Sequence, residues 1–147
     1  RDSLTNYLAG DAQPADIAQA TPVTRLFVIT SGPLPPNPVE LLSGAKMVDL
    51  LTLSSERFDY VIIDGPPVIG LADALVLANL ARTTLFVASA GSTRAGALDG
   101  AFKRLRAANA NLLGCILTKS GKTSSDHDYH YIYNYGGDDQ VTLPKQA

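Results

Sequence analysis

The chain has little cysteine, little charge and no long apolar run. Its 147 residues include one cysteine, Cys115, so an internal disulfide is excluded. A membrane-spanning helix needs roughly 18–20 apolar residues, and the longest candidate, Leu71–Ala81, is too short and is interrupted by Asp73. The net charge of −2 provides no basic field of the kind that binds nucleic acid. We therefore expect neither a bilayer-spanning segment nor a nucleic-acid partner in these residues.

The composition is that of a folded domain with a polar tail. Hydrophobic residues make up 46% of the chain and charged residues only 18%, which argues against disorder throughout. We predict one domain over residues 1–123 and a tyrosine-rich flexible tail over residues 124–147. The chain starts at Arg1 without a methionine, so we expect a piece of a longer protein. Cys115 lies in an apolar run, where we expect a small buried thiol.

Apolar runs and helical spacing predict alternating strands and helices. The predicted strands are Leu26–Ile29, Phe58–Ile63, Thr84–Ala88 and Leu112–Leu117. The predicted helices are Leu4–Leu8, which Gly10 closes, a helix that Asn37 and Pro38 begin and whose helical spacing extends to Val48, then Leu71–Ala81 and Arg94–Ala108. The stretches Asp11–Thr24 and Ser31–Asn37 are predicted loops.

The order of these elements predicts an α/β fold. The strands are apolar runs without clean alternation, as expected for parallel strands covered by helices on both faces. Ligands of such sheets bind beyond the carboxyl ends of the strands. Those ends are Thr30–Asn37, Asp64–Asp73, Ser89–Arg94 and Thr118–Thr123.

Asp64 is the most informative single residue. The apolar run Val61–Ile63 leads directly to this carboxylate, and Pro66 and Pro67 stiffen the chain beyond it. A carboxylate there can hold Mg²⁺, usually through water, because Mg²⁺ gives up its hydration shell reluctantly. The ion would neutralise charge on the oxygens of a transferring phosphate. The same pattern is explained equally well by an aspartate that ends a strand and caps a turn.

Three further residues are candidates for the same cofactor-binding site as Asp64. They are Asn37, Pro67 and Asp73, each at or near a predicted strand end. Each also has a structural explanation. Asn37 fits a helix N-cap, the prolines fit a rigid connector, and Asp73 fits a first-turn acid that interacts with the helix dipole.

The stretch Lys119–Thr123 ends in Gly-Lys-Thr, like a phosphate-binding loop. The pattern G-x-x-x-x-G-K-[ST] requires a glycine five residues before Gly121, where Ile116 stands. The stretch also leads into a polar tail and not into an amphipathic helix. We therefore reject it as a Walker A motif, and no other lysine in the chain fits one.

Four of the six tyrosines fall at alternate positions within seven residues: Tyr129, Tyr131, Tyr133 and Tyr135. In an extended strand they would share one face, so an edge strand with an aromatic face is one explanation. Their polar and glycine neighbours are poor core formers. The alternative is a flexible segment of phosphate acceptors, in which each phosphate adds about −1.5 to −2 charges.

Several segments together resemble the bacterial tyrosine kinases. Residues 61–67, Val-Ile-Ile-Asp-Gly-Pro-Pro, followed by Asp73, are similar to the Walker B region of that family. Residues 35–42 are close to its Pro-Pro-Asn-Pro-x-Glu-Leu-Leu, and Leu4–Gly10 resembles its short Gly-Leu-x-x-x-Leu-x-Gly segment. With the tyrosine cluster, the resemblance extends from Leu4 to Tyr135.

This family comprises the cytoplasmic catalytic domains of polysaccharide co-polymerases, which control capsular and exopolysaccharide export and chain length. The resemblance implies a three-layer parallel-sheet fold of the P-loop NTPase type, like that of the partitioning ATPases. It implies an ATP-dependent autokinase that holds Mg²⁺ at Asp64 and phosphorylates the tail tyrosines of neighbouring subunits in a ring. It also implies a place at the cytoplasmic face of the bacterial inner membrane, with a co-polymerase membrane segment or activator and a tyrosine phosphatase as partners.

The sequence departs from the family pattern in a few places. The Walker A loop and the second acidic motif would precede Arg1. Gly65 stands where the family usually has Thr or Ser, and Thr118 stands where many relatives have an Asn that contacts the nucleotide base. We therefore expect residues 1–147 alone to show no kinase activity.

Two other functions stay open. One is a degenerate, non-catalytic scaffold of the polysaccharide machinery, which the missing phosphate loop keeps open. The other is a partitioning-type or division-site-type ATPase, which shares the Walker B strand. The tyrosine cluster favours the autokinase over the ATPase, because such ATPases need no array of phenols.

Overall fold

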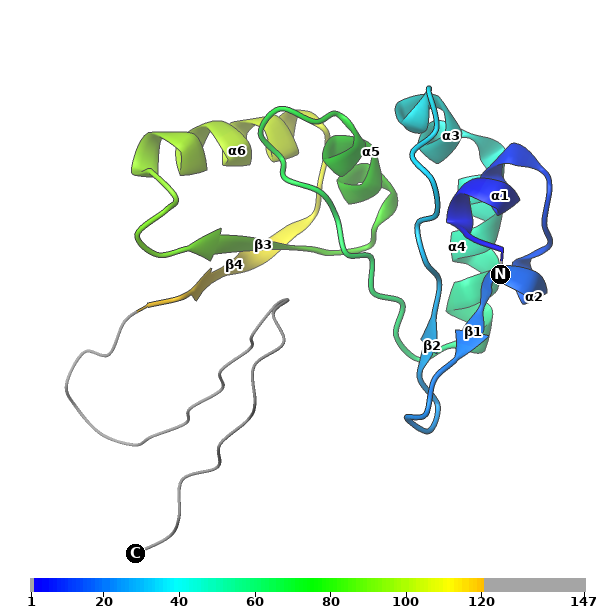
Figure 1. Cartoon of the computed structure of the whole chain (residues 1–147). Coiled ribbons are helices and arrows are strands. Elements are labelled where there is room, and N and C mark those ends of the chain that lie inside the picture. The colour runs from blue at the N-terminus through cyan, green and yellow to red at the C-terminus, as the bar shows by residue number, and fades with distance from the viewer. Residues whose placement is uncertain (1, 121–147) are drawn as a thin grey trace, which may run out of the picture.

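The computed structural model describes residues 2–120. Its elements, in chain order, are α1 (Leu4–Ala9), α2 (Pro14–Ile17), β1 (Gln19–Ala20), β2 (Phe27–Val28), α3 (Pro38–Ser43), α4 (Ala45–Arg57), α5 (Asp73–Leu80), β3 (Thr84–Ser89), α6 (Ala95–Ala107) and β4 (Leu112–Thr118). Figure 1 shows them in two groups, with α1–α4, β1 and β2 in one and α5, α6, β3 and β4 in the other. The groups meet where α3 packs against α5.

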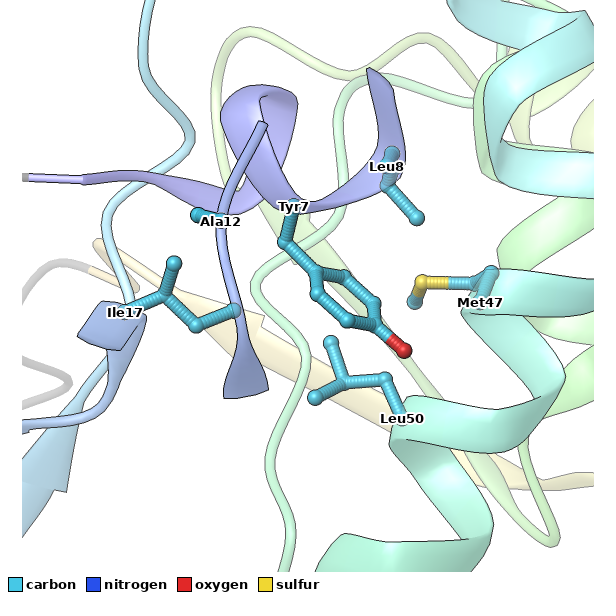
Figure 2. Close-up of a cluster of buried hydrophobic side chains, with 6 residues drawn as sticks. All are labelled: Tyr7, Leu8, Ala12, Ile17, Met47 and Leu50. Carbon is cyan, nitrogen blue, oxygen red and sulfur yellow. The ribbon is translucent and has the colours of Figure 1, made fainter. Parts of the chain in front are cut away.

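The first group has a small hydrophobic core around Tyr7. Its buried members are Tyr7, Leu8, Ala12, Ile17, Met47 and Leu50. Figure 2 shows the Tyr7 ring in the middle of this cluster, between Ile17 and Met47. The Tyr7 hydroxyl donates a hydrogen bond of 3.1 Å to the Lys46 carbonyl, which satisfies the polar end of a buried ring. Ile17 is completely buried.

Helix α1 begins and ends as its sequence predicts. Ser3 is the N-cap, and its hydroxyl accepts a hydrogen bond from the backbone N–H of Asn6. Gly10 ends the helix in the left-handed conformation at φ 100°, which glycine adopts without steric cost. The helix also fixes the loop after β2, because the N–H of Leu4 donates to the Thr30 carbonyl at 2.8 Å.

The predicted strand Leu26–Ile29 is present only in part, and the prediction that it is buried is wrong. Only Phe27–Val28 forms a strand, and it pairs antiparallel with β1 in a two-stranded sheet. Both β2 residues are more than 40% exposed. The antiparallel partner lies inside Asp11–Thr24, which was predicted to be loop and which also contains α2. Because β1 takes up the backbone hydrogen bonds of β2, this apolar run does not need a parallel strand beside it.

The helix predicted to start at Asn37 is present but divided. Asn37 is the N-cap of α3 and Pro38 is its first residue, as predicted. Gly44 then adopts an extended conformation, at φ −74° and ψ 161°, so that α3 ends and α4 begins on either side of it. Helical spacing alone does not detect this break, because both helices keep apolar residues on the same period.

The predicted strand Phe58–Ile63 is not a strand in the described part of the chain. Residues 58–63 carry no strand pairing, and Tyr60 and Ile62 are 87% and 90% exposed. An apolar run becomes a strand only when another strand takes up its backbone hydrogen bonds. Within residues 2–120 no strand does so.

The second group confirms the predicted strands Thr84–Ala88 and Leu112–Leu117 and the predicted helix Arg94–Ala108. β3 and β4 pair in parallel, with Val87 beside Ile116. Helix α6 packs against β3 on one face of this pair, where the Phe86 and Phe102 ring centroids lie 5.0 Å apart. Helix α5 is shorter than the predicted Leu71–Ala81, and only Ala74 and Ala78 of it are fully buried.

Cys115 was predicted to be buried, and that prediction is wrong. It is exposed on β4. The apolar run around it suggested a core strand, but nothing in the described residues covers this part of β4. The class prediction, α/β, agrees with the mixed helices and strands. The sheets described are two separate pairs, β1–β2 antiparallel and β3–β4 parallel, and not one four-stranded parallel sheet.

Candidate functional site

Asp64 lies in an exposed, irregular segment between α4 and α5. The apolar residues before it belong to no helix or strand, and Gly65-Pro66-Pro67 follows. Within residues 2–120, the Asp64 carboxylate has no hydrogen-bond or ion-pair partner, so it does not cap a turn. A free, solvent-facing carboxylate at this position can take a ligand without first breaking a protein contact.

Arg104 holds the loop that follows Asp64. Its guanidinium Nη1, on α6, donates a hydrogen bond of 3.2 Å to the Val68 carbonyl. This bond links α6 to the chain four residues beyond Asp64. In the sequence, Arg104 is one of three basic residues toward the end of the helix Arg94–Ala108, where basic residues interact favourably with the helix dipole. No pattern in the sequence pointed to the contact with Val68.

Asp73 is the first residue of α5 and is half-buried. The backbone of Ala72 caps this helix, and no side chain caps it. Asp73 therefore has the position of a first-turn acid, which interacts favourably with the positive end of the helix dipole. Among the described residues no hydrogen bond joins Asp73 to Asp64.

Asn37 and Pro67 lie on two different exposed loops. The side-chain amide of Asn37 donates a hydrogen bond of 2.7 Å to the Glu40 carboxylate, so this donor is already engaged. Because α3 packs against α5, the elements that carry Asn37 and Asp73 are neighbours. Pro67 shapes the loop between Asp64 and the Val68 carbonyl that Arg104 holds.

The carboxyl ends of β3 and β4 lie side by side. The Thr118 hydroxyl donates to the Ala88 carbonyl at 3.2 Å, and the N–H of Ala90 donates to the Thr118 carbonyl at 2.8 Å. The Ser89 hydroxyl is buried there and has no hydrogen-bond partner in the described structure. Sequence reasoning did not single out Ser89, because one serine at a strand end is indistinguishable from a turn residue.

Asp64 fits Mg²⁺ as a single carboxylate ligand. Within residues 2–120 no group of three or more His, Cys, Asp or Glu side chains could hold a metal. Mg²⁺ usually keeps several waters and uses one or two carboxylates together with substrate phosphates. The unpartnered Asp64 carboxylate matches that donor set.

Two further predictions concern the tail tyrosines and membrane-spanning helices. The tyrosines predicted to accept phosphate, Tyr129, Tyr131, Tyr133 and Tyr135, lie outside the described residues. Among the helices of residues 2–120, none is both long enough and apolar enough to cross a bilayer.

We expect replacement of Arg104 with alanine to loosen the loop after Asp64. The variant loses a solvent-exposed hydrogen bond to the Val68 carbonyl, and a typical intramolecular hydrogen bond contributes about 0.5–1.5 kcal/mol. Backbone ¹⁵N relaxation measures the effect: the order parameters of Val68 and Ile69 should fall toward the flexible range, below about 0.6. Arg106→Ala is the matched control, because Arg106 lies in the same turn and its side chain makes no hydrogen bond within the described residues. Equal order parameters in the two variants would remove Arg104 from any positioning role.

Comparison with curated proteins finds tyrosine-protein kinases. The chain is 38% identical over 116 residues to the tyrosine-protein kinase CpsD of Streptococcus agalactiae, which is 79% of this chain and 50% of that protein. It is 38% identical over 130 residues to the tyrosine-protein kinase YwqD of Bacillus subtilis, covering 88% of this chain and 54% of the relative. The chain thus spans about half the length of these relatives. No family model matches it.

Comparison with solved structures finds kinase domains of the same kind. The kinase domain of the Escherichia coli tyrosine kinase ETK superposes with a TM-score of 0.76 at 35% identity, covering 86% of this chain and 51% of that one. The BceF tyrosine kinase domain superposes with a TM-score of 0.74 at 36% identity, covering 78% of this chain and 48% of that one. The matched region therefore keeps the shape that it has in complete kinase domains.

Proposed function

Because this chain belongs, over most of its length, to the kinase domain of the bacterial tyrosine kinase family, we propose that it is part of a tyrosine autokinase of capsular or exopolysaccharide synthesis. The observation that carries the proposal is the match to tyrosine-protein kinases in both sequence and shape, at 38% identity over 116 residues and a TM-score of 0.76. A shared fold alone would not support an activity. Here the identity is high enough to support shared chemistry as well.

We propose that residues 1–123 form the carboxyl-terminal part of a three-layer kinase domain and that residues 124–147 form its phosphate-accepting tail. In that domain, β3 and β4 would belong to one larger parallel sheet. Asp64 would then lie at the carboxyl edge of this sheet, where ligands of α/β proteins bind. The expectation that residues 1–147 alone lack activity follows, since the phosphate-binding loop would come from the unmatched half.

The proposed reaction transfers the terminal phosphate of ATP to a tyrosine hydroxyl. When bound, Mg²⁺ would neutralise charge on the phosphate oxygens. Asp64 would hold the ion, mostly through water, and its exposed carboxylate has no competing partner in the described residues. Arg104, through the Val68 carbonyl, would fix the loop that carries Pro67. Asp73 and Asn37 would border the nucleotide.

The acceptors we propose are Tyr129, Tyr131, Tyr133 and Tyr135, offered to a neighbouring subunit in a ring. Loading them with phosphate would add about −1.5 to −2 charges each and drive subunits apart by repulsion. The proposed setting is the cytoplasmic face of the bacterial inner membrane. The proposed partners there are a co-polymerase membrane segment or activator and a tyrosine phosphatase.

Mass spectrometry of the protein purified from its native cell tests the proposal. We expect phosphate on several of the four tail tyrosines. Protein from cells treated with a tyrosine phosphatase after lysis is the control that assigns the added mass to phosphotyrosine. Absence of phosphate on all four, under conditions in which the cell makes polysaccharide, would replace the autokinase with a non-catalytic scaffold.

A further inference from the structure

The positive charge of the described chain is concentrated in its second group of elements. Residues 73–120 contain six Lys and Arg and two Asp, a net charge of +4. Residues 2–72 contain three Lys and Arg and eight Asp and Glu, a net charge of −5. Such a charge asymmetry indicates a partner of opposite charge for the positive part. The six cations are all exposed: Arg82, Arg94, Lys103, Arg104, Arg106 and Lys119.

Helix α6 carries three of these cations in its carboxyl-terminal half. Ala101 and Leu105 lie on its buried side, whereas Lys103 and Arg106 are exposed. Lys103 and Arg106 are three residues apart, so their side chains are neighbours on the helix surface. Because this surface faces away from the sheet, strands added to the sheet would not cover it.

Arg82 lies beside the end of the same helix. The Asn79 side-chain amide donates a hydrogen bond of 2.9 Å to the Ala108 carbonyl, directly after α6. The Asn111 side-chain amide donates one of 2.7 Å to the Arg82 carbonyl. These two bonds hold the turn before β3 against the turn after α6. We call Arg82, Lys103 and Arg106 the basic patch.

The basic patch is available to an anion. Within residues 2–120, the side chains of Arg82 and Arg106 make no hydrogen bond and no ion pair. Lys103 pairs with Asp99 at 2.7 Å, but both side chains are more than 60% exposed, and such a surface pair contributes little to stability. An anion that carries more than one charge can therefore replace Asp99 at small cost.

The tail of the same chain matches the patch in charge and in reach. Phosphate on its four clustered tyrosines would add about −6 to −8 charges to a segment that already contains four Asp and two Lys. Tyr129 lies 11 residues beyond Thr118, the last residue of β4, so the connecting chain can span up to about 36 Å. Helix α6 is only about 20 Å long. A tether of this length gives the tail a high effective concentration at the patch.

We propose that the phosphorylated tail of this chain docks on the basic patch of its own α6. The guanidinium groups of Arg82 and Arg106 donate paired, charge-assisted hydrogen bonds to phosphate oxygens, and Lys103 adds a point charge. The docked tail is then held on the outer side of α6, away from neighbouring subunits. The inference rests on the proposed function, because the phosphate on the tail is itself proposed.

A synthetic peptide of residues 124–147 with phosphotyrosine at all four clustered positions tests the docking. Titration calorimetry against the full 147-residue chain measures the affinity, and backbone amide chemical shifts locate the contact. We expect saturable binding that weakens as salt is raised, with the largest shifts at residues 81–83 and 102–108. The same peptide without phosphate is the control and should not bind.

Arg106→Glu is the test variant, and Arg57→Glu is its matched control. Each arginine is exposed in the last turn of its helix, α6 or α4, so the two substitutions change the net charge and a helix end alike. Arg106→Glu turns an attraction within the patch into a repulsion and should weaken peptide binding at least about fivefold. Arg57→Glu lies in the negative group and should change the affinity less than about twofold.

Ligation of the phosphorylated peptide to residues 1–123 gives the full chain with a loaded tail. We expect the same amide shifts at every protein concentration and a monomer by light scattering, because the tail docks on its own chain. Shifts that grow with concentration, together with a dimer, would assign the patch to the tail of a second copy and overturn the proposal.

Three further results would overturn it. The first is no binding of the phosphorylated peptide, and the second is equal weakening by Arg106→Glu and Arg57→Glu. The third is binding of the chain to phosphatidylglycerol vesicles without any binding of the peptide, which would assign the patch to a membrane surface. Since chemical synthesis supplies the phosphate, a failure here leaves the kinase proposal to its own test by mass spectrometry.

Discussion

Asp64→Asn should abolish phosphate on the tail tyrosines when it replaces the wild-type residue in the native gene. The substitution removes the charge that we propose holds Mg²⁺ but keeps the size of the side chain. Metal-held charge stabilisation contributes several kcal/mol to a phosphoryl-transfer barrier, so the rate should fall about 10²–10³-fold. Mass spectrometry of peptides containing Tyr129 and Tyr135, from cells with only the variant copy, measures the loss.

Asp59→Asn is the matched control for this experiment. Asp59 is an exposed carboxylate five residues earlier, and its one ion pair, with Arg25 at 2.9 Å, is on the surface. The free energy of unfolding of both variants should lie within about 0.5 kcal/mol of the wild-type value, because neither substitution removes a buried contact. Tail phosphate that persists in Asp64→Asn, or that disappears equally in Asp59→Asn, would exclude Asp64 as the metal-holding residue.

Ile17→Ala should cause the largest loss of stability among single substitutions in the described residues. Ile17 is completely buried beside Tyr7, and it and Leu105 are the largest side chains with less than 2% exposure among the described residues. Truncation of a buried isoleucine to alanine costs about 2–5 kcal/mol, from lost burial and from the cavity left behind. That is a large share of the about 5–15 kcal/mol that typically separates folded from unfolded domains.

Urea denaturation of the full chain, followed by circular dichroism, measures this effect. Val23→Ala is the matched control, since Val23 is a β-branched residue at 61% exposure and its truncation should change the free energy of unfolding by less than about 0.5 kcal/mol. Equal midpoints for the two variants would mean that the cluster in Figure 2 is not a stabilising core.

Local signals predicted the helices better than the strands. Gly10 specifies the end of α1, and Asn37 with Pro38 marks the start of α3, although the Asn37 side chain bonds to the Glu40 carboxylate and makes no capping hydrogen bond. In α6, Ala101 and Leu105 lie four residues apart on one side of the helix, and both are buried. Gly44 was missed as a break, because an isolated glycine inside a helical pattern is compatible with both a continuous helix and a helix end.

The candidate site was predicted in part. Asp64 followed from the apolar run before it, and the structure leaves its carboxylate exposed and unpartnered. The contact from Arg104 to Val68 joins residues 36 apart in sequence, so no local pattern carries it. The same limit applies to Ser89, whose hydroxyl is buried and which pairs with Thr118 of β4, 29 residues later in the chain. The roles of the four tail tyrosines stay predictions, since those residues lie outside the described part.

The sequence by itself determined which segments are apolar, where several helices start and stop, and which motifs mark the family. These properties depend on residue type and on short spacings, which act within a few turns of chain. Only the tertiary structure decided that residues 58–63 stay unpaired, that Cys115 is exposed, and that β3 and β4 are covered on one face. Strand pairing and burial are contacts between distant segments, and an apolar run is compatible with both the covered and the open arrangement until its neighbours are in place.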